Sequence, residues 1–221
     1  MVRKNSDRPG CQDVFHAFLV QDAEYDGDQE IPKIAPIDSR PNRMIPFSKI
    51  RQTNDYNQWV HFYEDDASFE RVWANPRQYL PILKRFNGVI SPDFSLFRDM
   101  PLVQQEWNTY RGKALGHWWQ KNGILVIPNV RTADERSYMF CCNGVARSSI
   151  IAVGSHGCLK YREERLYFQR GLEFCIEQLC PKTVVVYGAA PRDVFFCCYS
   201  RGIEVIQFDS EFASSRKDVS A

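Results

Sequence analysis

Thr183-Val-Val-Val-Tyr187, which stops at Gly188-Ala-Ala-Pro191, is the stretch that decides the fold class. It is a short β-branched run that ends on small residues. Four further apolar runs end in a similar way: Gly88-Val-Ile90, Ile124-Leu-Val-Ile127, Ile150-Ile-Ala-Val153 and Ile203-Glu-Val-Ile-Gln-Phe208. Unbroken runs separated by helix-like sequence are typical of parallel strands that are buried on both faces and joined by crossover helices. The sequence therefore predicts an α/β fold.

We expect one α/β domain over residues 56–212, with a mostly parallel five- to six-stranded sheet and crossover helices on both faces. A doubly wound sheet is favoured over an incomplete barrel, because five or six strand–helix units cannot close an eight-stranded barrel. The alternation over residues 59–63 predicts an additional edge strand. Residues 1–55 are rich in proline and predict an irregular N-terminal arm with a short helix over 13–20, and residues 213–221 predict a flexible tail.

Capping residues and apolar periodicity predict helices over residues 66–73, 75–85, 99–121, 162–179 and 192–200. In the longest of them, apolar residues recur every three or four positions and predict a buried stripe of Val103, Trp107, Tyr110, Ala114 and Trp118. Gly112 and Gly116 lie four residues apart on the neighbouring face. We expect them to allow another element to approach the helix closely.

The composition excludes several function classes. Hydrophobic residues make up 44% of the 221 residues, which is enough for a packed core and excludes wholesale disorder. Lys and Arg number 28 against 27 Asp and Glu, so the chain lacks the strongly basic character of many nucleic-acid-binding proteins. No apolar stretch reaches the length of a membrane span and no leader peptide opens the chain, so we expect a cytoplasmic protein without membrane contact.

Eight cysteines are many for this length. Cys141-Cys142 and Cys197-Cys198 are adjacent pairs within apolar sequence, which argues against an extracellular disulfide framework. No Cys-x-x-Cys pair is present, so the sequence predicts no zinc site. We interpret most of the cysteines as small buried hydrophobic residues.

Polar residues follow the predicted strands, and the carboxyl ends of parallel strands meet at one edge of a sheet. We therefore predict a site at this edge that is formed by Ser91, Asp93, Ser95, Asn129, Arg131, Ser155, His156 and Tyr187, with Asp209 nearby. Asp93 and His156 are the candidate catalytic residues, as an acid, base or metal ligand and as a proton carrier. The other six are candidate ligand-binding residues, with the Arg131 guanidinium suited to a phosphate or carboxylate.

Each of these residues also has a purely structural interpretation. Asp93 and Ser95 are common turn residues, and His156 lies in a Gly-Ser-His-Gly loop that needs no chemistry. That loop could instead expose backbone N–H groups to an anion. Arg131 could simply form a salt bridge with Asp134 or Glu135.

Several motifs between residues 88 and 131 resemble an uncharacterised family of bacteria, phages and mobile elements that carries only a domain-of-unknown-function label. They are Ser91-Pro-Asp-Phe-Ser95, Asp99-Met-Pro101, Trp107-Asn-Thr-Tyr-Arg111, Ala114-Leu-Gly116 and Ile127-Pro-Asn-Val-Arg131. Ala152-Val-Gly-Ser-His-Gly157 and Val186-Tyr-Gly188 resemble later motifs of the same family. The resemblance covers about residues 56–212 and implies a bacterial, phage or plasmid setting. It implies no reaction and no ligand.

Two function classes remain. The first is a protein that binds or processes a nucleotide or another phosphorylated small molecule at the strand-end edge. The second is a non-enzymatic phage or plasmid accessory that binds DNA or a host protein through its arm and an aromatic surface around Trp107, Tyr110 and residues 117–119. In the arm, Arg40, Arg43, Lys49 and Arg51 supply positive charge. A structural role is a third reading. The sequence assigns no cofactor, no oligomeric state and no definite enzymatic activity.

Overall fold

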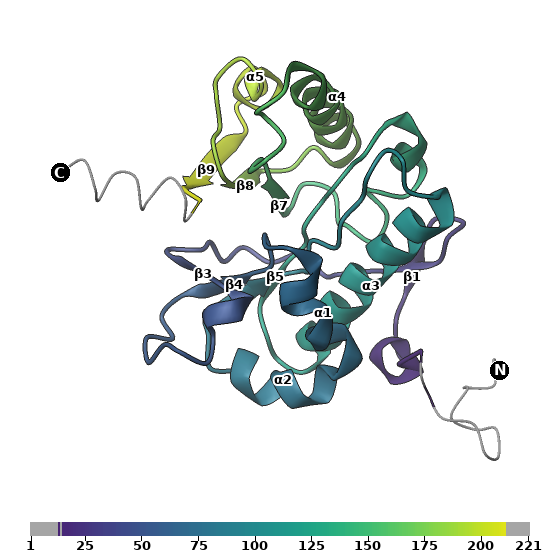
Figure 1. Cartoon of the computed structure of the whole chain (residues 1–221), viewed down its shortest axis with the longest axis vertical. Helices are drawn as coiled ribbons and strands as arrows, with labels where there is room; N and C mark the ends of the chain where they lie inside the picture. Colours follow the sequence, from purple (N-terminus) through teal and green to yellow (C-terminus); the bar gives the residue numbers. More distant parts are fainter. Residues whose placement is uncertain (1–12, 14, 211–221) are drawn as a thin grey trace.

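The computed structural model describes residue 13 and residues 15–210 of the chain (Figure 1). Residues 1–12 of the predicted arm and the predicted tail at 213–221 lie outside the described residues. Two parallel sheets form the centre of the molecule. The first has the order β3 (Met44–Pro46), β4 (Trp59–His61), β5 (Gly88–Ile90), β6 (Val126–Ile127), and the second the order β7 (Ile150–Gly154), β8 (Thr183–Tyr187), β9 (Glu204–Phe208).

The remaining elements surround these sheets. The N-terminal region contains an antiparallel pair, β1 (Tyr25–Asp26) and β2 (Ile31–Pro32), and two short 3₁₀ helices, η2 (Ala17–Val20) and η3 (Phe47–Lys49). The longer helices are α1 (Asp66–Ala74), α2 (Pro76–Leu83), α3 (Leu102–Lys121) and α4 (Arg162–Leu179). The other helical segments are a third 3₁₀ helix, η4 (Glu135–Met139), and a single helical turn, α5 (Phe196–Tyr199). In Figure 1, α1, α2 and α3 lie on the side of β3–β5, whereas α4 and α5 lie on the side of β7–β9.

The two sheets are joined where β6 ends. Asn129 and Ala152 form an isolated parallel bridge, in which Val130 N donates to Ala152 O and Ala152 N donates to Pro128 O. The first sheet therefore continues into the second through the residues that follow β6. At the outer edges of the two sheets, Arg40, which precedes β3, contacts Glu204 on β9. Its Nη1 atom is 2.8 Å from Glu204 Oε1.

Alternating residues of each strand belong to different cores, because successive side chains of a strand point to opposite faces. One core lies between the sheets and contains Trp59, Ile90, Ile127, Ile150, Ala152 and Val185. The residues beside them, such as Val60, Val126 and Val184, pack outward into two larger cores that include the helices. The strands are thus buried on both faces, which explains their unbroken apolar runs.

The α/β class, the mostly parallel pairing and the flanking helices are confirmed. The expected doubly wound order is wrong, because strands in both sheets follow one another in chain order without the reversal that such a sheet has. The inner face is covered by the opposite sheet. The arrangement is therefore closer to an open barrel than to a doubly wound sheet. It forms with fewer strands than an eight-stranded barrel, because the two sheets share one inner core.

The buried face of α3 overlaps the predicted stripe only in part. Ala114 is buried as predicted, and Tyr110 and Trp118 are partly buried against the core. Val103 and Trp107 are exposed, whereas the small residues Gly112 and Gly116 are buried. A Cβ atom on Gly112 would lie 2.8 Å from Pro92 O, and one on Gly116 would lie 2.5 Å from Ile34 Cδ1. The expected close approach is confirmed, and it selects the face on which α3 packs.

The N-terminal region is mostly irregular, as expected, but it also contributes to the sheet. Met44-Ile-Pro46 forms the edge strand β3 and pairs in parallel with β4. Phe47, directly after it, is fully buried and packs against Phe62 with ring centroids 5.1 Å apart. Among the described residues, no helix combines the length and the apolar character that a bilayer crossing requires.

Candidate functional site

The parallel strands bring three of the predicted site residues together. Asp93 follows β5, whereas Asn129 and Arg131 follow β6. Asp93 Oδ2 accepts a hydrogen bond from Arg131 Nη1 at 2.5 Å, and Asp93 Oδ1 accepts one from Asn129 Nδ2 at 2.7 Å. Arg131 therefore pairs with Asp93, while the alternative partners Asp134 and Glu135 pair with Arg136 and Arg170.

Three further side chains anchor Asn129. Its backbone N–H donates to Ser91 Oγ at 2.8 Å, and its side-chain Oδ1 accepts from the Tyr63 hydroxyl at 2.9 Å. Its carbonyl accepts from Lys113 Nζ of α3 at 2.5 Å. Asn129, which holds one carboxylate oxygen of Asp93, is thus itself anchored, and Asp93 in turn orients the Arg131 guanidinium through its other oxygen.

Burial shifts the pKa values of this network. Desolvation raises the pKa of Asp93, and the Arg131 charge and the hydrogen bond from Asn129 oppose this effect. Burial also raises the pKa of Tyr63 well above its usual range and lowers the pKa of Lys113 to about 8. A group of buried, perturbed ionisable side chains at strand ends is typical of a functional site, although structural networks share this feature.

His156 and Tyr187 lie beside this network. Tyr187 is buried and stacks on Tyr63 with ring centroids 5.1 Å apart. The exposed His156 ring contacts Tyr187 edge-on at 6.4 Å. The backbone N–H groups of Ser155 and His156 both donate to Tyr187 O, so these two donors are engaged within the chain.

The two remaining serines have local structural partners. Ser95 donates from its hydroxyl and its backbone N–H to the Asp66 carboxylate. Ser155 Oγ donates to Ala189 O at 2.6 Å, and the residue is buried. Neither serine lines the large cavity at this edge, so their contacts fit the structural interpretation better than a ligand contact.

A cavity of about 890 Å³ opens at the carboxyl ends of β6 and β7. Arg131 and His156 line it together with residues of α4 and the segment after β5. Asp93 lies behind Arg131 and does not line the cavity, but 29% of the Arg131 side chain remains exposed. The volume is within the usual range for a small-molecule site.

Aromatic side chains surround the same cavity. Phe97 and Tyr161 belong to its lining and are 54% and 62% exposed, which is unusual for large apolar side chains. Tyr167 also lines it and stacks under the guanidinium of Arg98 at 4.3 Å. Arg98 forms ion pairs with Glu163 and Glu164. The lining of the cavity thus combines exposed aromatic rings with two arginines, Arg98, which is paired with Glu163 and Glu164, and Arg131, which is paired with Asp93.

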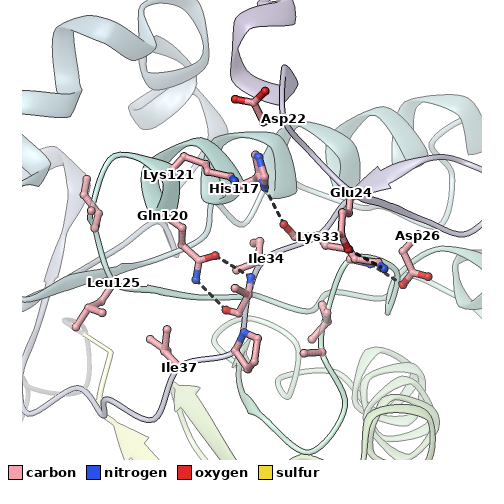
Figure 2. Close-up of a pocket in the computed structure, with 17 residues that line it drawn as sticks. Asp22, Glu24, Asp26, Lys33, Ile34, Ile37, His117, Gln120, Lys121 and Leu125 are labelled. Carbon is pink, nitrogen blue, oxygen red and sulfur yellow. Dashed lines mark hydrogen bonds and ion pairs between the residues drawn. The ribbon is translucent and has the colours of Figure 1, made fainter. Parts of the chain in front are cut away.

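A second cavity, of about 810 Å³, lies at the opposite end of the strands (Figure 2). Its polar side chains are largely engaged by the chain itself. Gln120 hydrogen-bonds both the N–H and the carbonyl of Ala35, and His117 Nδ1 lies 3.0 Å from Lys33 O, as the dashed lines in Figure 2 show. In α/β barrels ligands bind at the carboxyl ends of the strands, so this cavity is the weaker candidate.

Sequence reasoning missed three groups near the site. Tyr63 and His61 belong to the segment predicted as an edge strand, and their place at a strand end was the available signal. Burial lowers the pKa of His61 to about 3, with a smaller effect from the Lys49 charge. Lys113 was missed because a lysine on a helix is usually solvated, whereas this one lies in the tightly packed face next to Gly112.

Three cysteines form the third unexpected group. The sulfur atoms of Cys141, Cys142 and Cys175 lie within 4.8 Å of one another, which is close enough to share a metal ion. Among the described residues, no other group of three or more His, Cys, Asp or Glu side chains brings its ligand atoms this close together. Cys175 lies 33 residues after Cys142 in the chain, so spacing rules for local cysteine motifs could not find the group.

The sequence matches the family described as Domain of unknown function (DUF4417) over residues 23–209. The chain belongs to this family. The resemblance found in its motifs is thereby confirmed. DUF4417 is a label without a reaction, so the function must be argued from the site.

Two phage proteins are similar to this DUF4417 chain. The Gene 1 protein of Mycobacterium phage L5 is 33% identical over 187 residues, which cover 83% of this chain and 80% of that protein. The Gene 1 protein of Mycobacterium phage D29 is 29% identical over 219 residues, which cover 97% and 78% respectively. No solved structure matches the chain.

Proposed function

We propose that this DUF4417 protein binds a nucleotide or another phosphorylated small molecule in the cavity at the carboxyl ends of β6 and β7. The observation that carries the proposal is the lining of this cavity. The Arg131 guanidinium, the His156 imidazole and the exposed rings of Phe97 and Tyr161 lie around one space of about 890 Å³. A phosphate requires a cation with fixed donors, and a base requires a flat apolar contact.

Each residue has a defined role in this proposal. Arg131 binds the phosphate, and Asp93 acts through Arg131 by fixing its orientation from behind. His156 lines the cavity and has the role of proton carrier in this proposal. Tyr161 covers the ring of the ligand.

The cations of the N-terminal region support this choice over the DNA-binding alternative. Arg40 pairs with Glu204, and Arg43 Nη1 lies 2.6 Å from Asp55 Oδ2. The Arg51 guanidinium lies over the Tyr79 ring at 5.4 Å. These side chains are engaged within the chain, so they contribute little to a surface that would attract a phosphate backbone.

A thermal-shift panel tests the proposal. Inorganic phosphate, nucleoside mono- and triphosphates and the matching nucleosides are compared, each with and without Mg²⁺. At about 100 times Kd, a ligand stabilises the folded state by about 2.7 kcal/mol, which raises the Tm of a chain of this size by roughly 5–10 °C. We expect this shift with a phosphorylated ligand and a smaller one with its nucleoside.

Two exposed tyrosines provide a matched pair of variants. Tyr161→Ala removes a ring from the cavity and should reduce the shift, whereas Tyr199→Ala removes a ring that is 41% exposed outside it and should leave the shift intact. Absence of a shift with every ligand, or equal shifts in both variants, would count against this site.

A further inference from the structure

The three-cysteine group combines residues from two elements. Cys141 and Cys142 lie in the turn that follows η4, and Cys175 lies on the buried face of α4. Cys141 and Cys175 are buried and Cys142 is partly buried. The exposed Cys180 and the partly buried Cys158 do not join the group. The packing of α4 against η4 therefore concentrates three thiols at one point.

The spacing of the sulfur atoms fits a single metal ion. Zinc binds thiolate sulfur at about 2.3 Å, so two such ligands at a tetrahedral angle lie about 3.8 Å apart. The Sγ atoms of Cys141 and Cys142 are 3.8 Å apart, and Cys175 Sγ is within 4.8 Å of both. These separations are close to those of three thiolates that share one ion.

A buried cation lies next to the group. Lys113 of α3 is 3% exposed, and it lines one small cavity together with Cys141. A buried ammonium is costly unless negative charge lies nearby. Three thiolates around one Zn²⁺ carry a net charge of −1, which a single lysine neutralises.

We propose that Cys141, Cys142 and Cys175 together bind one Zn²⁺ ion. Binding displaces the three thiol protons to solvent and forms three zinc–sulfur bonds. Among the described residues, no fourth His, Cys, Asp or Glu atom joins the group. Cys175 also lines the large cavity, so the fourth coordination position is left to a water molecule or a ligand atom from that side. Three protein ligands with one open position are the arrangement of catalytic rather than structural zinc.

Metal analysis of the full chain tests this proposal. The protein is purified with a phosphine reductant and without chelator from zinc-supplemented medium, and its metals are measured by mass spectrometry. We expect about one zinc per chain, and a loss of roughly tenfold or more in Cys142→Ser and Cys175→Ser. The matched controls Cys158→Ser and Cys180→Ser should retain zinc, because their sulfur atoms lie outside the group.

A second measurement on the unaltered chain avoids dependence on variants that fail to fold. The metal-free protein is loaded with Zn²⁺, and its thiols are then titrated with a chromogenic reagent. Zinc should protect three thiols, and Co²⁺ in its place should give a thiolate-to-cobalt charge-transfer band. The proposal is overturned by a chain that stays zinc-free after loading, by full zinc content in both ligand variants, by iron or copper in place of zinc, or by a disulfide within the group.

Discussion

Protonation of the buried His61 should make the stability of the protein fall in mild acid. His61 is 1% exposed, its Nδ1 accepts a hydrogen bond from Tyr63 N at 3.2 Å, and its ring packs on Tyr187 with centroids 4.3 Å apart. Burial lowers the pKa of His61 to about 3 from its ordinary value of 6.5. Between these two values the unfolded chain holds a proton that the folded chain excludes, so the free energy of unfolding decreases as the pH falls.

The size of this decrease follows from the pKa values. The stability from neutral His61 is fully present above pH 6.5 and is lost progressively towards pH 3. At pH 5 the pH is 1.5 units below the pKa of the imidazole in the unfolded chain, and each unit corresponds to about 1.4 kcal/mol. The free energy of unfolding should therefore be lower by about 2 kcal/mol at pH 5 than at pH 8 because of this one residue.

Urea denaturation at pH 8 and pH 5 measures the effect by comparing the unaltered chain with His61→Asn. Asparagine keeps an acceptor for Tyr63 N but does not titrate, so the variant should lose about 2 kcal/mol of the pH dependence. His156→Asn replaces an exposed histidine and is the matched control that should keep it. Equal pH dependence in His61→Asn and the unaltered chain would refute the buried neutral state of His61.

Three further substitutions test the packing around the site, and urea denaturation at pH 7.5 measures each of them. Asp93→Asn leaves one acceptor for two donors, one of them Arg131, and should cost about 1–3 kcal/mol; an unchanged midpoint would contradict the network. Gly154→Ala places a Cβ 2.7 Å from the Tyr63 ring and should cost about 1–3 kcal/mol; a stabilised variant would show that the ring moves freely. Arg40→Ala removes an exposed ion pair and should cost less than about 1 kcal/mol, so a larger loss would reveal that this contact closes the sheet edges.

The elements predicted best are those whose pattern of buried residues is visible in the local sequence. The apolar run at residues 183–187 became β8, and the periodic segment at 162–179 became α4, both with the expected bounds. The edge strand β3 was missed because Met44-Ile-Pro46 is short and ends in proline, a residue that is depleted in strands. Its pairing with β4 depends on tertiary contacts that the local sequence does not encode.

Errors in α3 and in the strand order have a common physical origin. The predicted stripe of α3 is right at Ala114, which is buried, and wrong at Val103 and Trp107, which are exposed. The most buried face is shifted towards Gly112, because a residue without a side chain lets the chain at Pro92 approach closely. In the same way, strand order depends on which faces pack together. The direct contact between the inner faces of the two sheets, for example between Ile90 and Val185, is a long-range feature that hydrophobic periodicity leaves open.

The candidate site was predictable only as far as parallel strands impose convergence. The meeting of Asp93, Asn129 and Arg131 follows from their places after β5 and β6. The partners that hold them, Tyr63 and Lys113, come from a strand and a helix whose orientation was unknown. Tertiary packing, rather than local pattern, decides which polar side chains fix a strand-end residue.

Chemical-shift mapping of the ¹⁵N-labelled chain tests ligand binding at the carboxyl ends of the strands most directly. The probe is the phosphorylated ligand with the largest thermal shift, or inorganic phosphate if none exceeds it. We predict perturbations that concentrate at residues 131–133 and 154–158, around the cavity that Arg131 and His156 line. Perturbations confined to residues 33–37 and 117–125, around the cavity at the opposite end, or none at saturating ligand, would contradict the account.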